Sequence, residues 1–355
     1  MKVIVGMSGG VDSAVAACLL KAEGYDVTGV TLRTWLAEDG SESRCCEIED
    51  ARKTAWKLGI PYYALNCLSD FKKHVTEPFV KDYIQGRTPN PCTRCNRYVK
   101  WERMLYMARI LQADYIATGH YAGVVKLDNG RYTFRKAAHA EKDQTYMLYA
   151  LTQEQIAATL MPLGDLSKEE VREIAREAGL SVAEKADSQE ICFVSEGRNY
   201  SAYIEEQAAA DLQGTGCFVD ENGTVLGSHR GIIHYTVGQR KGLGLSLGYP
   251  AYVKEIKADA NEVVIGREQD LYCRTVICED INFLSIPSLN GKLQCTVKVR
   301  YQHPGQKAVI EMIGDSLVRI GFEDPVRAAA PGQAAVFYDE DGYLIGGGVI
   351  TTTER

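Results

Sequence analysis

Residues 3–13 read Val3-Ile4-Val5-Gly6-Met7-Ser8-Gly9-Gly10-Val11-Asp12-Ser13, and an apolar run follows at residues 14–20. A short β-branched run that breaks at two glycines and resumes as an apolar helix predicts a strand, a tight loop and a helix. Such a loop directs several backbone N–H groups to one point, where the helix N-terminus adds partial positive charge. The glycines let the backbone approach an anion closely, and the Ser8 and Ser13 hydroxyls can donate to it. The stretch therefore predicts a phosphate-binding loop, and it lacks the lysine of a Walker A loop.

The first 120 residues alternate short apolar runs with helical periodicity. Strands are predicted at residues 3–5, 26–32, 62–65 and 115–118, and helices at residues 11–22, 48–58, 71–83 and 97–111. This alternation is typical of an α/β domain with a doubly wound parallel sheet, which binds ligands at the carboxyl ends of its strands. The predicted phosphate loop lies at one of those ends.

The texture of the sequence changes in the C-terminal half. Residues 151–180 predict helices, with Ser167-Lys168-Glu169-Glu170 as a capping-type start. From about residue 195, short β-rich runs between turn signals predict two small β-barrel domains. The glycine-rich run 229–248 predicts either a basic loop that touches a partner or tight turns of a barrel. We therefore expect three domains, at residues 1–197, 198–268 and 269–355.

Composition describes an ordinary globular protein of 355 residues, with 45% hydrophobic and 25% charged residues. No apolar stretch of about 18 residues and no signal-like start are present, so we expect a cytoplasmic protein without a membrane partner. Eleven cysteines without a secretory signal indicate a reducing compartment. The net charge of −7 disfavours nucleic acid, but residues 87–103 carry five basic side chains against Glu102, enough for a local phosphate-binding patch.

The second informative stretch is Thr88-Pro89-Asn90-Pro91-Cys92-Thr93-Arg94-Cys95-Asn96. Its Cys-x-x-Cys lies near a predicted helix start beside Arg94 and Arg97, where a thiolate is stabilised. A structural zinc would need a further ligand pair that the chain lacks, and the surroundings differ from those of a thioredoxin-type motif. With Cys192 as a third thiol, two interpretations remain open: persulfide chemistry, or an iron–sulfur cluster such as [4Fe–4S] on Cys92, Cys95 and Cys192. The pair Cys45-Cys46 receives no role from the sequence.

Five motifs occur in a characteristic order, and they are the loop at residues 6–13, the Pro-Asn-Pro-Cys-x-x-Cys stretch, Thr118-Gly119-His120-Tyr121, Lys142-Asp143-Gln144-Thr145-Tyr146 and Asp187-Ser188-Gln189-Glu190-Ile191-Cys192-Phe193. The first matches the PP-loop of the ATP pyrophosphatases, which split ATP between its α and β phosphates. Together the five closely resemble the tRNA-specific 2-thiouridylases, which thiolate the wobble uridine of tRNA. The stretch 235–242 and the pair Arg300-Tyr301 extend the resemblance, which covers essentially the whole chain. It implies a PP-loop domain followed by two β-barrel domains.

The resemblance also implies roles for individual residues. ATP with Mg²⁺ would be held by Gly6, Met7, Ser8, Gly9, Gly10, Val11, Asp12, Ser13, Leu32 and Gly119. Asp12 would act there as a magnesium ligand or as a brace of the loop. Cys192 would carry a persulfide supplied by a sulfur-relay protein or a cysteine desulfurase, and Cys95 would be its catalytic partner. The target base would contact Asn90, Pro91 and Cys92, and the anticodon region of tRNA would contact His120, Lys142, Asp143, Gln144, Arg300, Tyr301 and Gln333.

One position departs from the family pattern. Many members have Asp where this chain has Cys92, and a carboxylate there could serve as a general acid or base. A thiol serves less readily, so the departure favours a metal role or a second redox partner at this position.

The expected reaction is adenylation of uridine O2, attack of the Cys192 persulfide on C2, and attack of Cys95 on the inner sulfur to leave a disulfide. Alternatively, Cys95 first frees a sulfide that attacks C2. Rival interpretations are another PP-loop enzyme, such as a different tRNA sulfurtransferase or a lysidine-type ligase, and a non-catalytic RNA-binding or iron–sulfur protein. The intact loop residues argue against lost catalysis.

Overall fold

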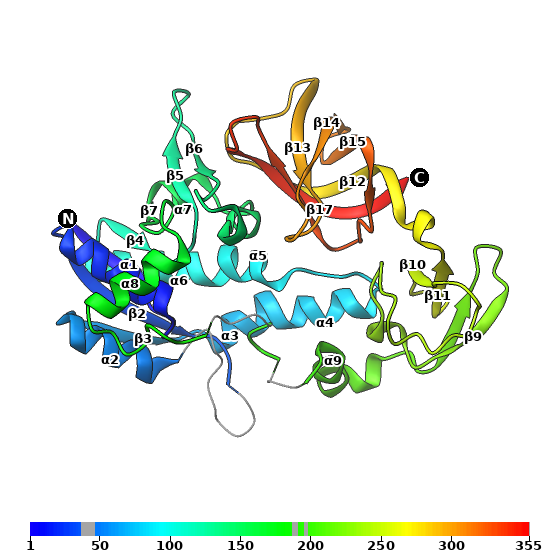
Figure 1. The fold of residues 1–355 in the computed structure, drawn as a ribbon, viewed down its shortest axis with the longest axis horizontal. Coiled ribbons are helices and arrows are strands. Elements are labelled where there is room, and N and C mark those ends of the chain that lie inside the picture. Colours follow the sequence, from blue (N-terminus) through cyan, green and yellow to red (C-terminus); the bar gives the residue numbers. More distant parts are fainter. Residues whose placement is uncertain (37–46, 187–190, 195–197, 355) are drawn as a thin grey trace. The chain divides into compact units, whose positions relative to one another are not determined.

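The computed structural model describes residues 1–36, 47–186, 191–194 and 198–354. The chain forms two compact units (Figure 1), each built from several stretches of sequence. Unit 1 comprises Met1–Val75, Cys92–Gly197 and Gly342–Leu344, whereas unit 2 comprises Thr76–Pro91, Arg198–Asp341 and Ile345–Arg355. The Pro-Asn-Pro-Cys-x-x-Cys stretch is therefore divided between the units, because the boundary falls between Pro91 and Cys92.

Unit 1 is built on a parallel sheet with the strand order β3-β2-β1-β4-β7. Its strands are β1 (Lys2–Gly6), β2 (Asp26–Arg33), β3 (Tyr62–Asn66), β4 (Tyr115–Ala117) and β7 (Thr159–Leu160). The central strand β1 is apolar on both faces, and Val3, Ile4 and Val5 are fully buried because helices cover both sides of the sheet. Val3 pairs with Val27 on one side and Tyr115 on the other. The predicted doubly wound sheet is confirmed, and its parallel strands bring their carboxyl ends to one edge.

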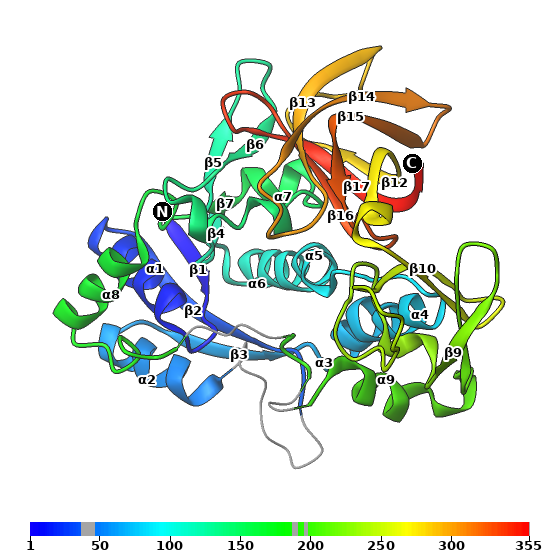
Figure 2. The same ribbon diagram turned by 45° about the vertical axis from the view of Figure 1, so that its right-hand side comes forward.

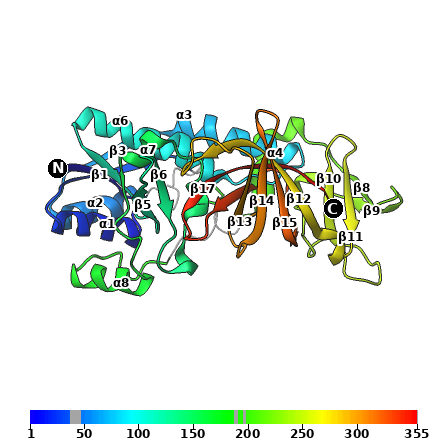
Figure 3. The same cartoon turned by 90° about the horizontal axis from the view of Figure 1, so that it is seen from above.

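Helices cover both faces of this sheet (Figure 3). On one face lie α1 (Val11–Ala22), α2 (Ile48–Leu58) and α8 (Lys168–Glu177), and on the other lies α6 (Glu102–Leu111). Small buried residues on α1, such as Ala16 and Ala17, let it pack closely in a core that also includes Val171 and Ala175 of α8. The predicted capping box at the start of α8 is confirmed, since Ser167 and Glu170 each bond the backbone N–H of the other.

Two of the predicted helices contain π-helical turns. The helix expected at residues 71–83 comprises α3 (Leu68–Phe71), a π-helical turn (Lys72–Thr76) and α4 (Glu77–Ile84). The helix expected at residues 97–111 begins earlier, with α5 (Pro91–Cys95) and a π-helical turn (Asn96–Trp101) before α6. The Cys-x-x-Cys therefore lies in the first helical turn, where Pro91 is well tolerated because a first-turn N–H has no helical acceptor.

The segment 151–180 is less helical than predicted. It contains α7 (Gln153–Ala157) and then the two-residue strand β7, which pairs with β4. A hairpin of β5 (Gly123–Lys126) and β6 (Tyr132–Arg135) was also not predicted. Short 3₁₀ turns complete the described part of unit 1 at Ala140–Lys142 and Thr145–Met147.

Unit 2 contains a closed barrel and an open sheet (Figure 2). The barrel strands follow the order β12-β15-β14-β13-β16-β17 and surround an apolar core that includes Val297, Ile310 and Phe337. Their bounds are β12 (Tyr272–Phe283), β13 (Lys292–Lys298), β14 (Gln306–Ile313), β15 (Leu317–Arg327), β16 (Ala334–Tyr338) and β17 (Leu344–Glu354). The C-terminal barrel is confirmed. Where the other barrel was expected, the chain forms a four-stranded sheet in the order β10-β11-β8-β9.

The strands of this sheet are β8 (Gly216–Val219), β9 (Val225–His229), β10 (Tyr252–Lys257) and β11 (Glu262–Gly266). The glycine-rich run 229–248 forms turns, since each of its five glycines has a positive φ. Unit 2 also contains α9 (Tyr200–Ala208), a helix that was not predicted, and the 3₁₀ turns Ala209–Asp211, Ile232–His234 and Glu268–Leu271. Within the described residues, we find no helix that combines the length and the hydropathy of a membrane span.

Candidate active site

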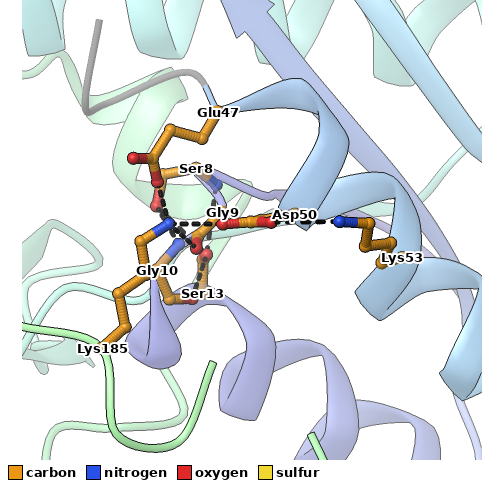
Figure 4. A network of polar contacts seen from close by, with 8 residues as sticks. All are labelled: Ser8, Gly9, Gly10, Ser13, Glu47, Asp50, Lys53 and Lys185. Carbon is orange, nitrogen blue, oxygen red and sulfur yellow. Dashed lines mark hydrogen bonds and ion pairs between the residues drawn. The ribbon is translucent and has the colours of Figure 1, made fainter. Parts of the chain in front are cut away.

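The loop between β1 and α1 is held together by its own serines (Figure 4). Ser13 Oγ accepts a hydrogen bond from the Ser8 N–H at 3.1 Å, lies 3.2 Å from Ser8 Oγ, and donates to the Gly10 carbonyl at 3.1 Å. The Gly10 N–H donates to Ser8 Oγ at 3.3 Å. Gly10 is the N-cap of α1 and supplies no capping side chain. Two hydroxyls and an uncapped helix N-terminus thus lie together at the carboxyl end of β1, which is the chemistry that an anion-binding loop needs.

Gly9 allows the start of α2 to close over this loop. Its φ is +84°, and a Cβ atom at this position would lie 2.6 Å from the Glu47 carbonyl oxygen. The Glu47 N–H in turn donates to the Ser8 carbonyl at 3.1 Å. Glycine is therefore required here for its conformation and for its size.

Asp12 braces the first turn of α1. Its Oδ1 atom accepts hydrogen bonds from the Tyr121 hydroxyl and from the Lys168 ammonium group, each at 2.7 Å. The Lys168 side chain is only 8% exposed and lies at the first residue of α8. A lysine there opposes the helix dipole, so its pairing with Asp12 offsets an unfavourable position. Of the two roles expected for Asp12, these contacts support the brace.

Gly119 packs against protein backbone in this structure. A Cβ atom on Gly119 would lie 2.7 Å from the carbonyl carbon of Asp12 and 2.7 Å from the Ser13 nitrogen. The chain after β4 therefore touches the first turn of α1 directly, and Tyr121 adds the bond to Asp12. The Thr118–Tyr121 motif consequently supports the loop from the side.

Other predicted nucleotide-binding residues contribute to packing. Met7, Val11 and Leu32 are buried, and Gly6 lies beside the Met104 side chain. The Met7 N–H donates to the Val30 carbonyl at 2.8 Å, which continues the pairing of β1 with β2. These side chains shape the floor of the loop, whereas Ser8, Ser13 and the backbone supply its polar groups.

Lys185 reaches the loop from the segment that follows α8 (Figure 4). Its Nζ atom donates to the Gly9 carbonyl at 3.2 Å, to Asp50 Oδ2 at 2.6 Å and to the Glu47 carboxylate. Burial lowers the pKa of this lysine, but the hydrogen bonds to Asp50 and Glu47 outweigh burial and leave the pKa raised. Lys185 is therefore charged at neutral pH. Sequence reasoning singled out neither Lys185 nor the pairing of Lys168; the only signal was that Lys185 directly precedes the motif ending in Cys192.

The two cysteines of the Cys-x-x-Cys differ in exposure. Both lie in α5, where Cys92 is exposed and Cys95 is buried. Arg94 Nε donates to the His74 carbonyl at 2.9 Å, and the Arg94 and Arg97 guanidinium groups lie 5.4 and 5.2 Å from the centre of the Tyr98 ring. The basic side chains expected beside the thiols are thus directed at an aromatic ring and a carbonyl, and the helix N-terminus is the feature left to stabilise a thiolate.

Cys192 is half-buried beside an aromatic anchor. The adjacent Phe193 is buried and packs edge-on against Phe71, with ring centres 5.7 Å apart. Residues 187–190 of this motif, and the pair Cys45-Cys46, lie outside the described residues. Cys92, Cys95 and Cys192 are all free thiols in unit 1.

A metal or cluster would need at least three ligands in one place. Among the residues that the structure describes, no three His, Cys, Asp or Glu side chains are placed to hold a metal ion. Cys92, Cys95 and Cys192 are all described, so in this conformation they do not fit a cluster.

Four predicted tRNA-contact residues belong to unit 1, and two of them make internal bonds. Asp143 is buried and accepts from the N–H groups of Ala137 and Thr145 and from the Thr145 hydroxyl. Gln144 Oε1 accepts from the Tyr121 N–H at 3.0 Å, and the Gln144 N–H donates to the Tyr121 carbonyl at 3.1 Å. These two residues hold the motif together, and Lys142, the third residue of their motif, is half-buried beside them.

His120 is an uncharged ring in this unit. Burial, together with the charge of Lys100, lowers the pKa of His120 to about 3. Its Nδ1 atom lies 2.9 Å from Thr118 Oγ1, and its ring centre lies 5.5 Å from that of Trp101.

The other predicted contacts of the base and the tRNA belong to unit 2. Asn90 is half-buried and Pro91 is buried, and the stretch leading to them is fixed at Thr88. The Thr88 N–H donates to the Pro331 carbonyl at 2.7 Å, and Gln333 Nε2 donates to the Thr88 carbonyl at 2.9 Å. Gln333 therefore braces the approach to Asn90.

Arg300 and Tyr301 lie in a basic part of the barrel. Arg300 donates to the Arg327 carbonyl at 3.3 Å, and the Lys298 ammonium lies 5.9 Å from the centre of the Tyr301 ring. Burial, with the charges of Arg300 and Lys298, lowers the pKa of the neighbouring His303 to about 4.

Three domain families match the chain in succession. A tRNA methyl transferase HUP domain matches residues 1–196, a tRNA methyl transferase PRC-barrel domain matches residues 202–267, and an aminomethyltransferase beta-barrel domain matches residues 273–350. The descriptions refer to methyl transfer, although the curated relatives carry another activity in their names.

Those relatives match nearly the whole chain. A tRNA-specific 2-thiouridylase of Lachnoclostridium phytofermentans is 52% identical over 98% of this chain and 99% of that protein. One from Clostridium perfringens is 49% identical over 98% of both. Among solved structures, a U34-tRNA thiolase from Methanococcus maripaludis with its [4Fe–4S] cluster covers 59% of this chain and 64% of its own, at 18% identity and a TM-score of 0.37. That likeness is too low to carry an argument.

Proposed function

Because the chain belongs to the family of tRNA-specific 2-thiouridylases, we propose that it catalyses the ATP-dependent 2-thiolation of uridine at the wobble position of tRNA. It is then a tRNA-uridine 2-sulfurtransferase that releases AMP and pyrophosphate. One observation carries this proposal: the anion-binding loop of Ser8 and Ser13 belongs to the same compact unit as the free thiols of Cys95 and Cys192. Activation by ATP and sulfur chemistry are thereby assigned to one unit.

The loop serves the activation step. ATP, as its Mg²⁺ complex, places its phosphates against the uncapped N-terminus of α1 and the two serine hydroxyls. Uridine O2 attacks the α phosphate and pyrophosphate leaves. The oxygen, otherwise a poor leaving group, can now depart with AMP. Asp12 holds the first turn in place through Tyr121 and Lys168.

The thiols serve the transfer step. The terminal sulfur of a persulfide on Cys192 attacks C2 of the base, and AMP leaves with O2. The Cys95 thiolate then attacks the Sγ atom of Cys192, which breaks the persulfide bond and leaves the terminal sulfur on the base. A disulfide between the two cysteines results, and a cellular thiol reduces it before the next turnover. In the alternative order, Cys95 first releases the sulfur as hydrosulfide, which attacks C2.

Recognition of the base and the tRNA involves the remaining predicted residues. Asn90, Pro91 and Cys92 surround the target base, and His120, Lys142–Gln144, Arg300, Tyr301 and Gln333 contact the anticodon region or support residues that do. A wobble base must leave its stack to be modified, so shape and contacts to an unstacked loop guide recognition. A sulfur-relay protein or a cysteine desulfurase supplies the sulfur to Cys192.

The proposal also covers location and domains. The enzyme works in the cytoplasm, which is supported by the nine described cysteines that are free thiols. Its domains run through residues 1–197, 198–268 and 269–355, and the change from helices to strands after α9 supports this division.

An iron–sulfur version of the reaction is not adopted, because Cys92, Cys95 and Cys192 do not converge among the described residues. No step of the proposed reaction passes through a cluster.

The test is thiolation of unmodified tRNA with ATP and a sulfur donor under anaerobic conditions. The protein is assayed both as metal-free protein and after reconstitution with iron and sulfide. We expect 2-thiouridine and AMP from the metal-free protein, and no product from the same tRNA with cytidine at the wobble position. Absence of thiouridine in both preparations would overturn the proposed function. Product from the reconstituted protein alone would replace the persulfide route with cluster chemistry.

A further inference from the structure

Lys185 is a point at which three parts of unit 1 meet (Figure 4). Its ammonium group bonds the Gly9 carbonyl of the phosphate loop and the carboxylates of Glu47 and Asp50 at the start of α2. An ammonium group has three protons, so these three acceptors account for all of them. The position of the side chain is therefore specified by two elements far from it in sequence.

The backbone of Lys185 is fixed as well. Arg172 of α8 donates from one guanidinium nitrogen to the Ala183 carbonyl at 2.5 Å and from the other to the Lys185 carbonyl at 2.9 Å. The guanidinium fork presents its donors in a fixed geometry, so it holds both carbonyl groups at once. Lys185 is thus anchored to α8 by its main chain and to the loop by its side chain.

The anchored segment leads directly to the predicted sulfur-carrying residue. Cys192 follows Lys185 by seven positions in the sequence, and Phe193 is buried against Phe71. The chain that carries Cys192 is therefore attached at Lys185 on one side and at Phe193 on the other.

We infer that Lys185 is a positioning residue that couples occupancy of the phosphate loop to the placement of Cys192. The inference rests on the proposed function for the roles of ATP and Cys192. A phosphate in the loop attracts the Lys185 ammonium group and repels the carboxylates of Glu47 and Asp50. Nucleotide therefore favours the arrangement in which Lys185 is drawn to the loop, and linkage requires that this arrangement and nucleotide stabilise each other. Because Arg172 holds the same residue, the preference extends to the segment that carries Cys192.

The test measures the alkylation rate of Cys192 by iodoacetamide, resolved by peptide mass spectrometry, without tRNA or sulfur donor. The probe is Mg²⁺ with an ATP analogue that has a methylene bridge between its α and β phosphates. In the unaltered protein, we expect this nucleotide to slow alkylation of Cys192 by about fivefold or more. Cys217, a half-buried thiol of unit 2, serves as the internal reference and keeps its rate.

Three variants separate the coupling from general effects. In Lys185→Met, the nucleotide effect on Cys192 falls to a ratio near one, and Lys185→Arg restores most of it. Lys53→Met is the matched control, because Lys53 also pairs with Asp50, at 3.8 Å, but does not bond Gly9; it keeps the full effect. If Lys185→Met does not fold, Glu47→Gln/Lys185→Met removes a negative charge together with the positive one and is measured instead.

The inference is overturned if the lysine variants retain the nucleotide effect, or if nucleotide binds to the unaltered protein without altering the rate at Cys192. Neither result depends on thiolation. A protein that shows the coupling but makes no 2-thiouridine would instead overturn the proposed function alone.

Discussion

Gly9 combines a left-handed backbone with close contact to the start of α2. Replacing it with alanine strains φ and drives a Cβ atom to 2.6 Å from the Glu47 carbonyl oxygen. We expect Gly9→Ala to weaken binding of the ATP analogue by about tenfold or more and to destabilise the protein by more than the ~1 kcal/mol of a strained φ alone. Nucleotide titration and denaturant unfolding measure the two effects.

Gly24→Ala is the matched control for this change. Gly24 has a φ of +87°, yet a Cβ atom there would meet nothing within 4 Å. We expect it to lose about 1 kcal/mol of stability and no nucleotide affinity. Equal behaviour of the two variants would show that the contact with α2 does not matter.

The two thiols give the second prediction at the residue scale. Cys95→Ser and Cys192→Ser should each lower thiolation by about a hundredfold or more, because a hydroxyl neither carries a persulfide nor opens one. Binding of the ATP analogue should persist, since neither residue is part of the loop. Cys217→Ser serves as a control that keeps activity, and appreciable turnover by either active-site variant would contradict the paired-thiol mechanism.

At the scale of elements, α8 is joined to α1 by one ion pair. Lys168 is buried at the start of α8, while the Asp12 side chain is 32% exposed, which reduces the pair's contribution. A double-mutant cycle with Lys168→Met and Asp12→Asn should give a coupling energy of about 1–2 kcal/mol in denaturant unfolding. The exposed pair Arg109 and Glu154 is the reference, for which we expect about 0.5 kcal/mol or less. Equal coupling in both cycles would refute the brace.

The elements that sequence reasoning missed depend on partners elsewhere in the fold. β7 has two residues and no period of its own; it forms because Thr159 and Leu160 pair with β4. The β5–β6 hairpin is continued by a bridge from Arg135 to Tyr343, a contact between distant parts of the sequence. α9 had a readable cap, since the Asn199 side chain accepts from the Ala202 N–H, but its tyrosines resemble those of a strand. Elements with a strong local period, such as α2, were predicted with their observed bounds.

At the scale of the whole molecule, each unit holds a histidine that stays uncharged. The pKa values of His120 and His303 are lowered to about 3 and about 4, mainly by burial and further by nearby basic groups. An unfolded histidine has a pKa of about 6.5, so between pH 6.5 and pH 4 the unfolded chain binds protons that the folded chain does not. The free energy of unfolding should therefore fall as the pH falls through this window.

Two measurements check this prediction. NMR titration should leave both rings neutral from pH 8 to pH 5, and urea unfolding should show decreasing stability over the lower part of this range. His303→Gln should reduce the slope while keeping an acceptor for the Gly305 N–H, which now donates to His303 Nδ1 at 3.1 Å. Titration of either ring near pH 6.5 would contradict the expectation.

The sequence by itself determined the strand–loop–helix of the phosphate site, the parallel sheet, the C-terminal barrel and the identity of the thiols, because local period, glycine placement and motif order carry that information. Only the tertiary structure decided which groups hold the loop. Lys185 bonds Gly9 across 176 positions, and Lys168 and Tyr121 bond Asp12 across 156 and 109. No local pattern encodes such contacts, because they exist only once the sheet has brought α1, α8 and the end of β4 to the same edge.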